Sequence, residues 1–387
     1  MIIKTQKIVL IMVVVMICIM NGRLSASAEA TERYEEEIEN LLQNMTLEEK
    51  VAQLFVILPE QLVDADVVTG AYEATKEAID SVPVGGLVYM AQNLQSAEQI
   101  QEMLINVQRY SMERIGLPAL LCVDEEGGSV SRINGRGIVD APYVTDMAEI
   151  GQSGAPQEAY LVGDVIGTYL EQLGFNVDFA PVADVLSNEN NQVVRYRSFG
   201  SDPQLVSQMV LSEVQGLQNH SIYATLKHFP GHGGTQEDSH SGQAYLYGTL
   251  EELQSCELIP FQDAISEEID FIMVGHIILP EVQQEQLPSS ISGEIISGLL
   301  RERMGYQGIV ITDAMNMGAI SGYYSSADAA RRAIMAGADL ILMPADFYSA
   351  YYGVVQSVHD GELSEERIDE SLKRIFRVKM KLREDMR

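Results

Sequence analysis

Three of the six histidines of the chain lie within one fourteen-residue segment, KHFPGHGGTQEDSH, at residues 227–240. His228 and His232 are four residues apart, which is the spacing of a metal-binding pair on a helix. Pro230 and the neighbouring glycines break a helix, so the segment is predicted to be the end of a strand followed by a loop. A loop can still hold a metal, and a metal site on His228, His232 and His240 is one interpretation.

The second half of the segment indicates proton transfer instead. Asp238 precedes His240 by two residues, and a carboxylate in that position can accept a hydrogen bond from one ring nitrogen and fix the tautomer. The other ring nitrogen can then carry a proton to and from a substrate. The glycines of the segment would allow the loop to close over a bound ligand.

Further ionisable residues follow apolar runs elsewhere in the chain. Asp313 ends the run GIVIT and precedes a predicted helix, so it can be a nucleophile, a metal ligand or a helix cap. Asp124, Glu125 and Glu126 precede two glycines that allow a close approach of the backbone to a ligand. Three acids there favour sugar binding, a cation site or an acid pair for catalysis, and a solvated acidic turn is the plain alternative.

Basic residues can balance this acidity and hold hydroxyl groups. We expect this of Arg132, Arg197 and Lys227. The strand-like runs thus end in ionisable residues at several places, and His276 ends another of them. In a barrel of parallel strands, active sites gather at the carboxyl ends of the strands.

Eight short apolar runs alternate with amphipathic segments along the chain. They lie at residues 53–58, 86–90, 119–124, 177–182, 223–229, 271–277, 308–314 and 339–344. Continuous apolar strands that alternate with helices indicate a parallel sheet covered on its faces. Eight of them predict a single-domain α/β fold, the (β/α)8 TIM-type barrel. A doubly wound sheet is the alternative fold.

The first 28 residues have the composition of a secretory signal peptide. Lys4 and Lys7 precede thirteen apolar residues, and a run of small residues ends at Ala28. Thirteen apolar residues are short of the about 20 that span a bilayer, so a cleaved signal is favoured over an anchor. We therefore expect a secreted or extracytoplasmic protein with residues 1–28 as the signal, residues 29–387 as one catalytic domain, and no stable membrane insertion after cleavage.

The charge of the chain excludes one class of partner. The formal net charge is 25 − 56 = −31, and removal of the signal with its three basic residues changes it to 22 − 56 = −34. Such an acidic protein repels phosphate backbones, so a nucleic-acid partner is not expected. The mature chain keeps two cysteines, of which Cys122 lies in an apolar run and is predicted to be a buried thiol. A bridge from Cys122 to Cys256 stays open.

Seven segments of the chain, in this order, resemble glycoside hydrolase family 3. They are DEEGGSVSR, FAPVADV, RSFGSDP, KHFPGHGGTQEDSH, MVGHI, LLRERMGYQGIVITDAMNM and AGADLILMP. They span about residues 45–345, and they are most similar to the β-N-acetylglucosaminidases of that family. The resemblance implies a single (β/α)8 barrel and a carbohydrate substrate, with no cofactor and no metal.

The resemblance also implies a role for individual residues. Asp313 matches the nucleophile that forms a covalent glycosyl-enzyme, His240 the acid/base and Asp238 its partner. This agrees with retaining hydrolysis, which needs a nucleophile on one face of the sugar and an acid/base on the other. Six further residues match those that hold the sugar at the cleavage site: Asp124, Arg132, Arg197, Lys227, His228 and His276. The expected activity is that of a retaining exo-β-N-acetylglucosaminidase on peptidoglycan fragments or chitin-type oligosaccharides.

The chain departs from the family pattern at two places. Ser129 stands where the family usually has arginine, and Glu125 where it has glutamine; Arg195 and Tyr196 stand where it often has glycine and a polar residue. These changes concern the leaving-group sugar rather than the chemistry. The alternatives are a β-glucosidase or β-xylosidase of the same family, substrate-assisted hydrolysis with Glu125 or Glu126 as acid, a metal-dependent barrel hydrolase, and a non-catalytic sugar-binding protein. Phosphate in place of water as acceptor is a further hypothesis.

Overall fold

The computed structural model describes residues 33–239 and 242–386. The chain divides into two compact units, residues 1–45 and Thr46–Arg387. In the first unit the described part is a helix over residues 33–44, where the sequence has a charged helical pattern. The predicted signal peptide lies outside the described residues. In the part of the chain that the structure describes, no helix is both long and apolar enough to cross a membrane.

The second unit is built on a parallel sheet of eight strands. The strands are β1 (Phe55–Ile57), β2 (Gly86–Tyr89), β3 (Leu120–Val123), β4 (Val177–Asp178), β5 (Tyr223–Phe229), β7 (Phe271–Val274), β9 (Ile309–Thr312) and β10 (Ile341–Leu342). Their order in the sheet is β10-β1-β2-β3-β4-β5-β7-β9, so neighbours in space follow one another in sequence. Each of the eight predicted apolar runs contains one of these strands. Almost every strand residue is buried, which explains why the runs lack alternation.

Backbone hydrogen bonds between β9 and the segment that begins β10, the two ends of this strand order, close the sheet into a barrel. Thr312 N donates to Leu340 O at 3.0 Å, and Leu340 N donates to Val310 O at 3.0 Å. On the other side of β10, Phe55 of β1 pairs with Ile341. β10 therefore lies between β1 and β9, and the predicted (β/α)8 barrel is confirmed.

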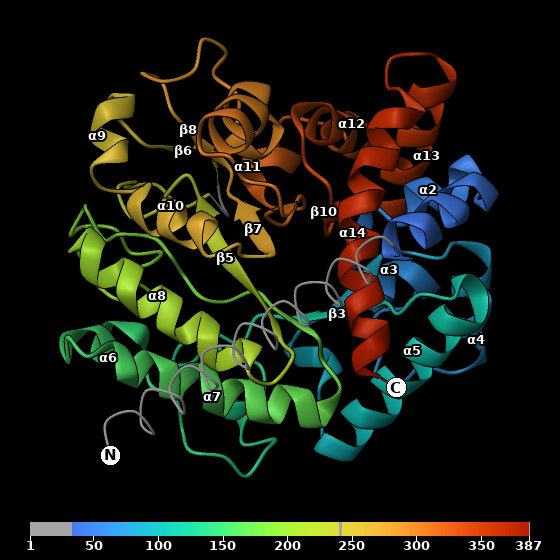
Figure 1. The fold of residues 1–387 in the computed structure, drawn as a ribbon, viewed down its shortest axis with the longest axis horizontal. Helices are drawn as coiled ribbons and strands as arrows, with labels where there is room; N and C mark the ends of the chain where they lie inside the picture. Colours follow the sequence, from blue (N-terminus) through green and yellow to red (C-terminus); the bar gives the residue numbers. More distant parts are fainter. Residues whose placement is uncertain (1–32, 240–241, 387) are drawn as a thin grey trace, which may run out of the picture. The chain divides into compact units, whose positions relative to one another are not determined.

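Helices surround the strands in Figure 1. They are α2 (Leu47–Ala52), α3 (Pro59–Val63), α4 (Glu73–Ser81), α5 (Ala97–Ile115), α6 (Met147–Gln152), α7 (Pro156–Leu173), α8 (Pro203–Gln218), α9 (Leu250–Gln254), α10 (Ile259–Ser266), α11 (Gly318–Ser321), α12 (Ser326–Ala336), α13 (Phe347–His359) and α14 (Glu365–Asp385). Short 3₁₀ turns occur at η1 (Ala91–Asn93), η2 (Asn134–Arg136) and η3 (Ser289–Ile291), and η4 (Glu294–Arg303) is a π-helix. A parallel two-stranded sheet joins β6 (Ala244–Tyr245) to β8 (Ile277–Ile278).

Local sequence signals explain where several helices begin and end. Thr46 and Glu49 form the predicted capping box at the start of α2. Gly116 and Gly174 end α5 and α7 with positive φ values of 72° and 96°, a conformation that glycine adopts without strain. These caps fix the lengths of the two long helices that lead into β3 and β4.

Lys379 is a lysine in the interior of the barrel unit that has no acidic partner among the hydrogen bonds and ion pairs of the described residues. Lys379 of α14 is fully buried, and its Nζ donates to Gln53 Oε1 at 2.8 Å. Burial lowers the pKa of Lys379 to about 7, although the nearby Cys122 thiol opposes this shift. Cys122 and Cys256 are both free, so the open question of a bridge between them is answered.

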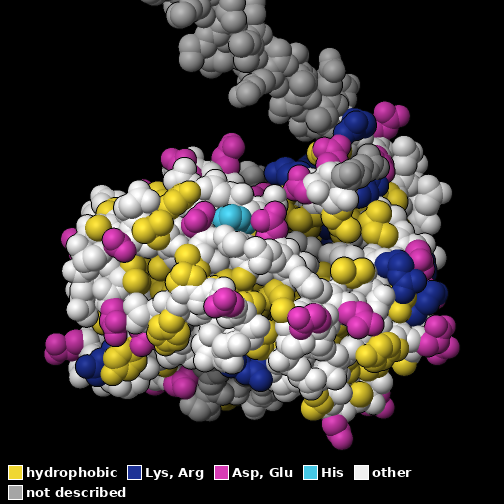
Figure 2. Space-filling view, turned by 90° about the horizontal axis from the view of Figure 1, so that it is seen from below, with side chains coloured by type: hydrophobic (Ala, Val, Ile, Leu, Met, Phe, Trp, Pro, Cys, Tyr) yellow, Lys and Arg dark blue, Asp and Glu magenta, His cyan; other side chains and the backbone are white. Residues whose placement is uncertain are grey.

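Acidic side chains are spread over the whole face that Figure 2 shows, while lysines and arginines lie in small groups. This distribution follows from a composition with 56 acidic and 25 basic residues. An anionic ligand that approaches this surface is therefore repelled unless a local cation attracts it.

Candidate active site

A pocket of about 690 Å³ lies at the carboxyl ends of the barrel strands. Asp124 follows β3, Asp313 follows β9, and Lys227 and His228 belong to the last part of β5. Seven of the predicted site residues line this pocket: Asp124, Arg132, Arg197, Lys227, His228, Asp238 and Asp313. The topology thus brings together side chains that are up to 189 residues apart, from 124 to 313, as expected for a barrel.

An irregularity in β5 explains how two consecutive residues reach the same pocket. Side chains alternate between the faces of a regular strand, yet Lys227 and His228 both line the pocket. The pairing register between β5 and β7 shifts between Leu226 and Phe229. Such an irregularity next to a site re-aims a side chain that would otherwise point away.

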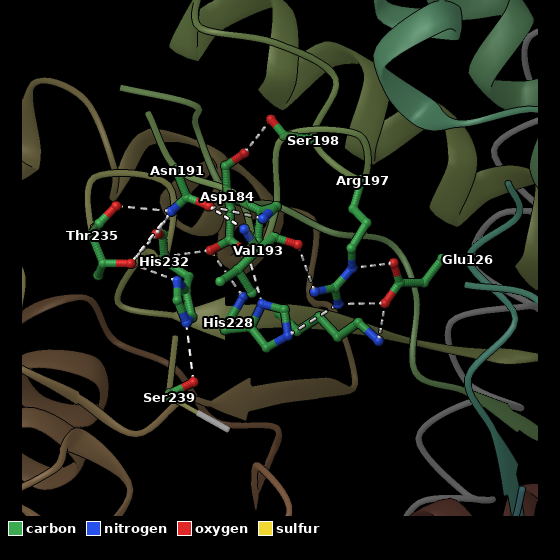
Figure 3. Close-up of polar contacts among 12 residues, drawn as sticks. Glu126, Asp184, Asn191, Val193, Arg197, Ser198, His228, His232, Thr235 and Ser239 are labelled. Atoms are coloured by element: carbon green, nitrogen blue, oxygen red, sulfur yellow. Dashed lines mark hydrogen bonds and ion pairs between the residues drawn. The ribbon is translucent and has the colours of Figure 1, made fainter. Parts of the chain in front are cut away.

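The buried Lys227, the partly buried Arg197 and two carboxylates form the floor of the pocket. The Lys227 ammonium lies 2.8 Å from Asp124 Oδ1 and 2.5 Å from Glu126 Oε1. Arg197 binds Glu126 through two bonds of 2.7 Å each, the bidentate geometry shown in Figure 3. The more distant Arg132 lies 3.9 Å from Asp124. Within the described residues, the two carboxylates accept two of the three N–H donors of Lys227. The third N–H can therefore donate to a substrate hydroxyl.

These contacts keep the network ionised in spite of its burial. Burial would raise the pKa of Glu126, but Arg197 and Lys227 hold it far below the usual range. Burial would lower the pKa of Lys227, but Asp124 and Glu126 raise it. A carboxylate with so low a pKa is a poor proton donor, and this argues against Glu126 as the acid of a substrate-assisted reaction. The role of Glu126 is to hold the two cations in place.

Asp184, in the loop after β4, fixes the orientation of His228. The Asp184 carboxylate lies 2.7 Å from His228 Nδ1 and accepts hydrogen bonds from the backbone N–H groups of His228 and His232. His228 Nε2 lies 3.4 Å from an Arg197 nitrogen, which fits a ring that carries its proton on Nδ1. Burial would raise the pKa of Asp184, but the two histidines lower it. Sequence analysis assigned no role to Asp184.

His232 lies behind the pocket, where it anchors the loop that carries Asp238. Its ring nitrogens lie 2.8 Å from Thr235 Oγ1 and 3.1 Å from Ser239 Oγ, and the ring is buried (Figure 3). Burial lowers the pKa of His232. Both ring nitrogens are thus engaged within the protein. The described residues hold no group of three or more His, Cys, Asp or Glu that could bind a metal.

The ends of β7 and β9 position Asp313 and His276. The Asp313 N–H donates to Val274 O at 2.9 Å, and its carboxylate accepts from Ala314 N at 2.7 Å. Helix α11 begins only at Gly318, after a different cap, so Asp313 is not a helix cap. His276 is fully buried, lies 2.7 Å from Ser290 Oγ and 3.0 Å from Ala314 O, and does not line the pocket. It supports the segment behind Asp313.

Asp238 is exposed and lines the same pocket as Asp313. His240, its predicted partner, lies outside the described residues. The segment that leads to it is a strand end followed by a loop, as predicted from Pro230 and the glycines. Ser239, the last residue described before His240, is fully buried.

Glu125 organises the loop after β3 and does not line the pocket. Its carboxylate accepts hydrogen bonds from the backbone N–H groups of Arg132, Ile133 and Asn134 and from the Tyr169 hydroxyl. This arrangement places Arg132 at the pocket. Because Glu125 is fully buried and its oxygens are engaged by these donors away from the pocket, it cannot reach a leaving oxygen and is also unsuited to the role of a substrate-assisted acid.

Two further buried carboxyl groups lie near this network. Burial raises the pKa of Glu213 on α8 to about 8, and the Glu126 charge adds to the shift. Burial likewise raises the pKa of Asp178 well above its usual range. Neither oxygen of Glu213 has a hydrogen-bond partner in the described residues. Glu213 is therefore a neutral acid at pH 7.

Comparisons with known proteins show the family of the chain. The family model described as the glycosyl hydrolase family 3 N-terminal domain matches residues 46–378. The chain is 33% identical over 330 residues to β-hexosaminidase A of Pseudoalteromonas piscicida, which covers 79% of this chain and 55% of that protein. It is 31% identical over 264 residues to the β-hexosaminidase of Stenotrophomonas maltophilia strain K279a, covering 67% of this chain and 76% of that one.

A solved structure of the same family is also similar to the chain. The family 3 β-N-acetylglucosaminidase from Paenibacillus sp. str. FPU-7 superposes with a TM-score of 0.82 at 36% identity, covering 88% of this chain and 63% of that one. The chain therefore belongs to glycosyl hydrolase family 3. It spans 55% of the length of the Pseudoalteromonas protein and 63% of the Paenibacillus chain.

Proposed function

We propose that the protein is a retaining exo-β-N-acetylglucosaminidase that releases terminal N-acetylglucosamine from peptidoglycan fragments or chitin-type oligosaccharides. Family membership and the names of the relatives support the sugar and the reaction. The observation that carries the proposal is the pocket itself, which is lined by both Asp313 and Asp238 and by the ionised Lys227 and Arg197. Retaining hydrolysis needs both a nucleophile, here Asp313, and an acid/base, here the Asp238–His240 pair, whereas a protein that only binds sugar needs neither.

In the proposed reaction, Asp313 attacks the anomeric carbon of the terminal sugar. The bond to the leaving oxygen breaks as His240, paired with Asp238, donates a proton to that oxygen. Water then attacks the glycosyl-enzyme, with His240 as base, and configuration is retained. Lys227, Arg197 and Asp124 hold the hydroxyl groups of the sugar meanwhile. Because Glu126 keeps both cations fixed, they are in place before the substrate binds, which lowers the cost of reorganisation.

The N-terminal sequence supports export of the enzyme. The basic start, the apolar stretch and the small residues up to Ala28 have the pattern of a signal peptide. Expression of the full chain in a bacterial host with a general secretion pathway, followed by N-terminal sequencing of the exported protein, tests this. A mature chain that begins at residue 29 supports export and cleavage, whereas retention of Met1 in the cytoplasmic fraction refutes them.

The decisive experiment compares chromogenic β-N-acetylglucosaminide and β-glucoside substrates in the presence of a chelator. We expect cleavage of the acetamido substrate. NMR should show that the sugar is first released as the β-anomer. Asp313→Asn should lower kcat by at least about 10³-fold, the loss expected when a catalytic group is removed. Asp360→Asn is the control: it removes the same charge from an exposed aspartate and should leave kcat unchanged.

Other outcomes of this experiment point to other functions. Preference for the glucoside would indicate a β-glucosidase, and loss of activity in chelator a metal-dependent hydrolase. Asp313→Ala adds a sharper test, because azide can replace the missing carboxylate as nucleophile. An α-glycosyl azide product would support Asp313 as the nucleophile, and activity in Asp313→Asn close to that of the unchanged protein would refute it.

A further inference from the structure

Exposed tyrosines gather on the face of the barrel that contains the active-site pocket. Among the described residues the exposed tyrosines are Tyr72, Tyr143, Tyr196, Tyr247, Tyr323, Tyr348 and Tyr352. Each lies between the carboxyl end of a barrel strand and the helix that returns to the next strand, or in the first two turns of that helix. The carboxyl ends of parallel barrel strands share one face, which is the catalytic face. Exposed aliphatic residues such as Ile105 and Leu161 lie instead along the outer helices α5 and α7.

Four tyrosines form two pairs of nearly parallel rings on this face. The ring centres of Tyr245 and Tyr247 are 6.2 Å apart, with 19° between the ring planes. Those of Tyr348 and Tyr352, on α13, are 6.3 Å apart, with 26° between the planes. In each pair the protein binds the hydroxyl of one ring, because Tyr245 donates to Gln243 Oε1 at 2.8 Å and Tyr348 donates to a backbone carbonyl of α3 at 3.4 Å. The other ring is exposed, by 67% in Tyr247 and by 60% in Tyr352.

Such pairs suit the flat face of a sugar ring. A tyrosine offers an apolar ring face together with a polar hydroxyl, so that one side chain can contact both the C–H groups and the hydroxyl groups of a sugar. A ring that already packs against a fixed neighbour loses little conformational freedom when a ligand binds. The chain contains no tryptophan, so tyrosine is the side chain that can supply this kind of contact.

The two pairs lie on different sides of the catalytic face. Tyr245 and Tyr247 follow β5, whereas Tyr348 and Tyr352 follow β10, and β7 and β9 lie between these two strands in the barrel. At about 4.8 Å per strand, the pairs are separated by about 14 Å along the barrel wall. In Figure 1, α11, the short helix after Asp313, lies between β6 and α13. A ligand that contacts both pairs is therefore an extended chain that passes the pocket.

The acidic character of the protein favours an uncharged partner for these rings. Carboxylates lie beside both pairs: Glu237 accepts a hydrogen bond from Tyr245 N at 3.5 Å, and Asp64 adds to the rise in the pKa of Tyr348 that burial causes. A protein with a net charge of −31 repels anionic lipids, nucleic acids and acidic glycans. A neutral polysaccharide meets no such repulsion, and its hydroxyl groups can donate to these carboxylates.

We propose that the two pairs, Tyr245–Tyr247 and Tyr348–Tyr352, form a docking surface for a neutral, insoluble polysaccharide of β-linked N-acetylglucosamine, the class to which chitin belongs. This inference rests on the proposed function and deepens it, because it gives the enzyme a polymer to which it stays adsorbed while the pocket removes terminal sugars. Two contacts on one rigid body also hold a polymer more tightly than either contact alone.

The test measures adsorption to insoluble chitin particles with variants made in the Asp313→Asn protein, so that hydrolysis does not consume the chain ends. Tyr247→Ala and Tyr352→Ala should each lower the partition coefficient about threefold, and the double variant about tenfold, because each removes about one aromatic contact. Tyr352→Phe keeps the ring and should adsorb like its parent. Added sodium chloride should not weaken adsorption, because the partner is uncharged.

Ile105→Ala is the matched control. Ile105 on α5 is 63% exposed and lies away from the catalytic face, so this variant should adsorb like its parent. With Asp313 intact, Tyr352→Ala should leave kcat/KM for the chromogenic acetylglucosaminide unchanged, because Tyr352 does not line the pocket. Equal adsorption of the double variant and its parent would overturn the inference, as would an equal loss in Ile105→Ala.

Two further results distinguish this inference from its alternatives. Stronger binding to phosphatidylcholine vesicles than to chitin would overturn it, because the rings would then fit a lipid surface. Cleavage of the chromogenic substrate without adsorption to chitin would overturn this inference and leave the proposed function in place. Adsorption that depends on the rings, in a protein that does not cleave the chromogenic substrate, would support the docking surface and overturn the proposed function.

Discussion

Replacement of Lys379 by methionine should change how the stability of the protein depends on pH. Lys379 is fully buried, and its pKa falls from 10.5 to about 7. At 1.36 kcal/mol per pKa unit, this fall corresponds to about 5 kcal/mol of unfolding free energy. Above pH 7 the folded state has lost the Lys379 proton while the unfolded state still holds it, so the Lys379 contribution makes the protein more stable as pH rises toward 10.5.

The assay is urea unfolding of the unchanged protein and of Lys379→Met at several values between pH 7 and 9. The slope from Lys379 rises to about 1.4 kcal/mol per pH unit above its folded-state pKa, so the difference between the two proteins should change by about 2 kcal/mol over this range. Methionine leaves Gln53 Oε1 without its donor, but that loss is the same at each pH and does not affect the slope. The advantage of Lys379→Met should be largest at pH 7.

A matched variant separates burial from the loss of a positive charge. Lys381 lies on the same helix with its side chain 55% exposed, and Lys381→Met should show no such change between pH 7 and 9. A difference between the unchanged protein and Lys379→Met that stays constant across these pH values would refute the reasoning. The Lys379 ammonium would then be solvated or paired in the folded protein, and its burial would carry no cost.

Two other buried groups lead to related predictions. Glu126→Gln should cost about 3 kcal/mol of stability, because the buried Lys227 and the partly buried Arg197 lose their shared anion. Urea unfolding checks this, and a variant as stable as the unchanged protein would show that the network is not required. Glu213→Gln should gain stability relative to the unchanged protein as pH rises from 5 to 8. The folded state keeps the Glu213 proton up to its pKa of about 8 while the unfolded state loses it near 4.5, so the unchanged protein loses about 1.4 kcal/mol per pH unit in this range; parallel stability curves for the two proteins would contradict this.

The fold was predictable because each barrel strand is a short apolar run. Tyr223–Phe229 forms β5 with the predicted bounds, whereas β4 is shorter than its run and covers only Val177–Asp178. The chain continues past β4 in an extended form, and Val182 makes a single further bridge to Lys227. Periodicity indicates where an apolar strand lies, but the residue at which pairing stops depends on neighbouring strands that are distant in sequence.

The positions of the site residues were harder to predict than their identities. The ends of apolar runs pointed to Asp124, Lys227 and Asp313, which all line one pocket. The contacts of Glu126 and Asp184 gave no such signal, since their partners lie 71 and 44 residues away in the sequence. Asp184 lies two residues past the run at 177–182, within the segment FAPVADV, but neither its position nor that segment indicated that it would bind His228.

The position of β10 has a consequence for the order in which the protein becomes active. β10 pairs with β1 through Phe55 and Ile341, and the segment before it bonds to Thr312, the residue that precedes Asp313. Phe55 and Ile341 are nearly three hundred residues apart in the chain. Contacts so distant in sequence form late in folding. The pocket around Asp313 is therefore complete only after the last barrel strand has been synthesised and has docked. A nascent or truncated chain that lacks residue 341 onward should be inert, however well its earlier strands have folded.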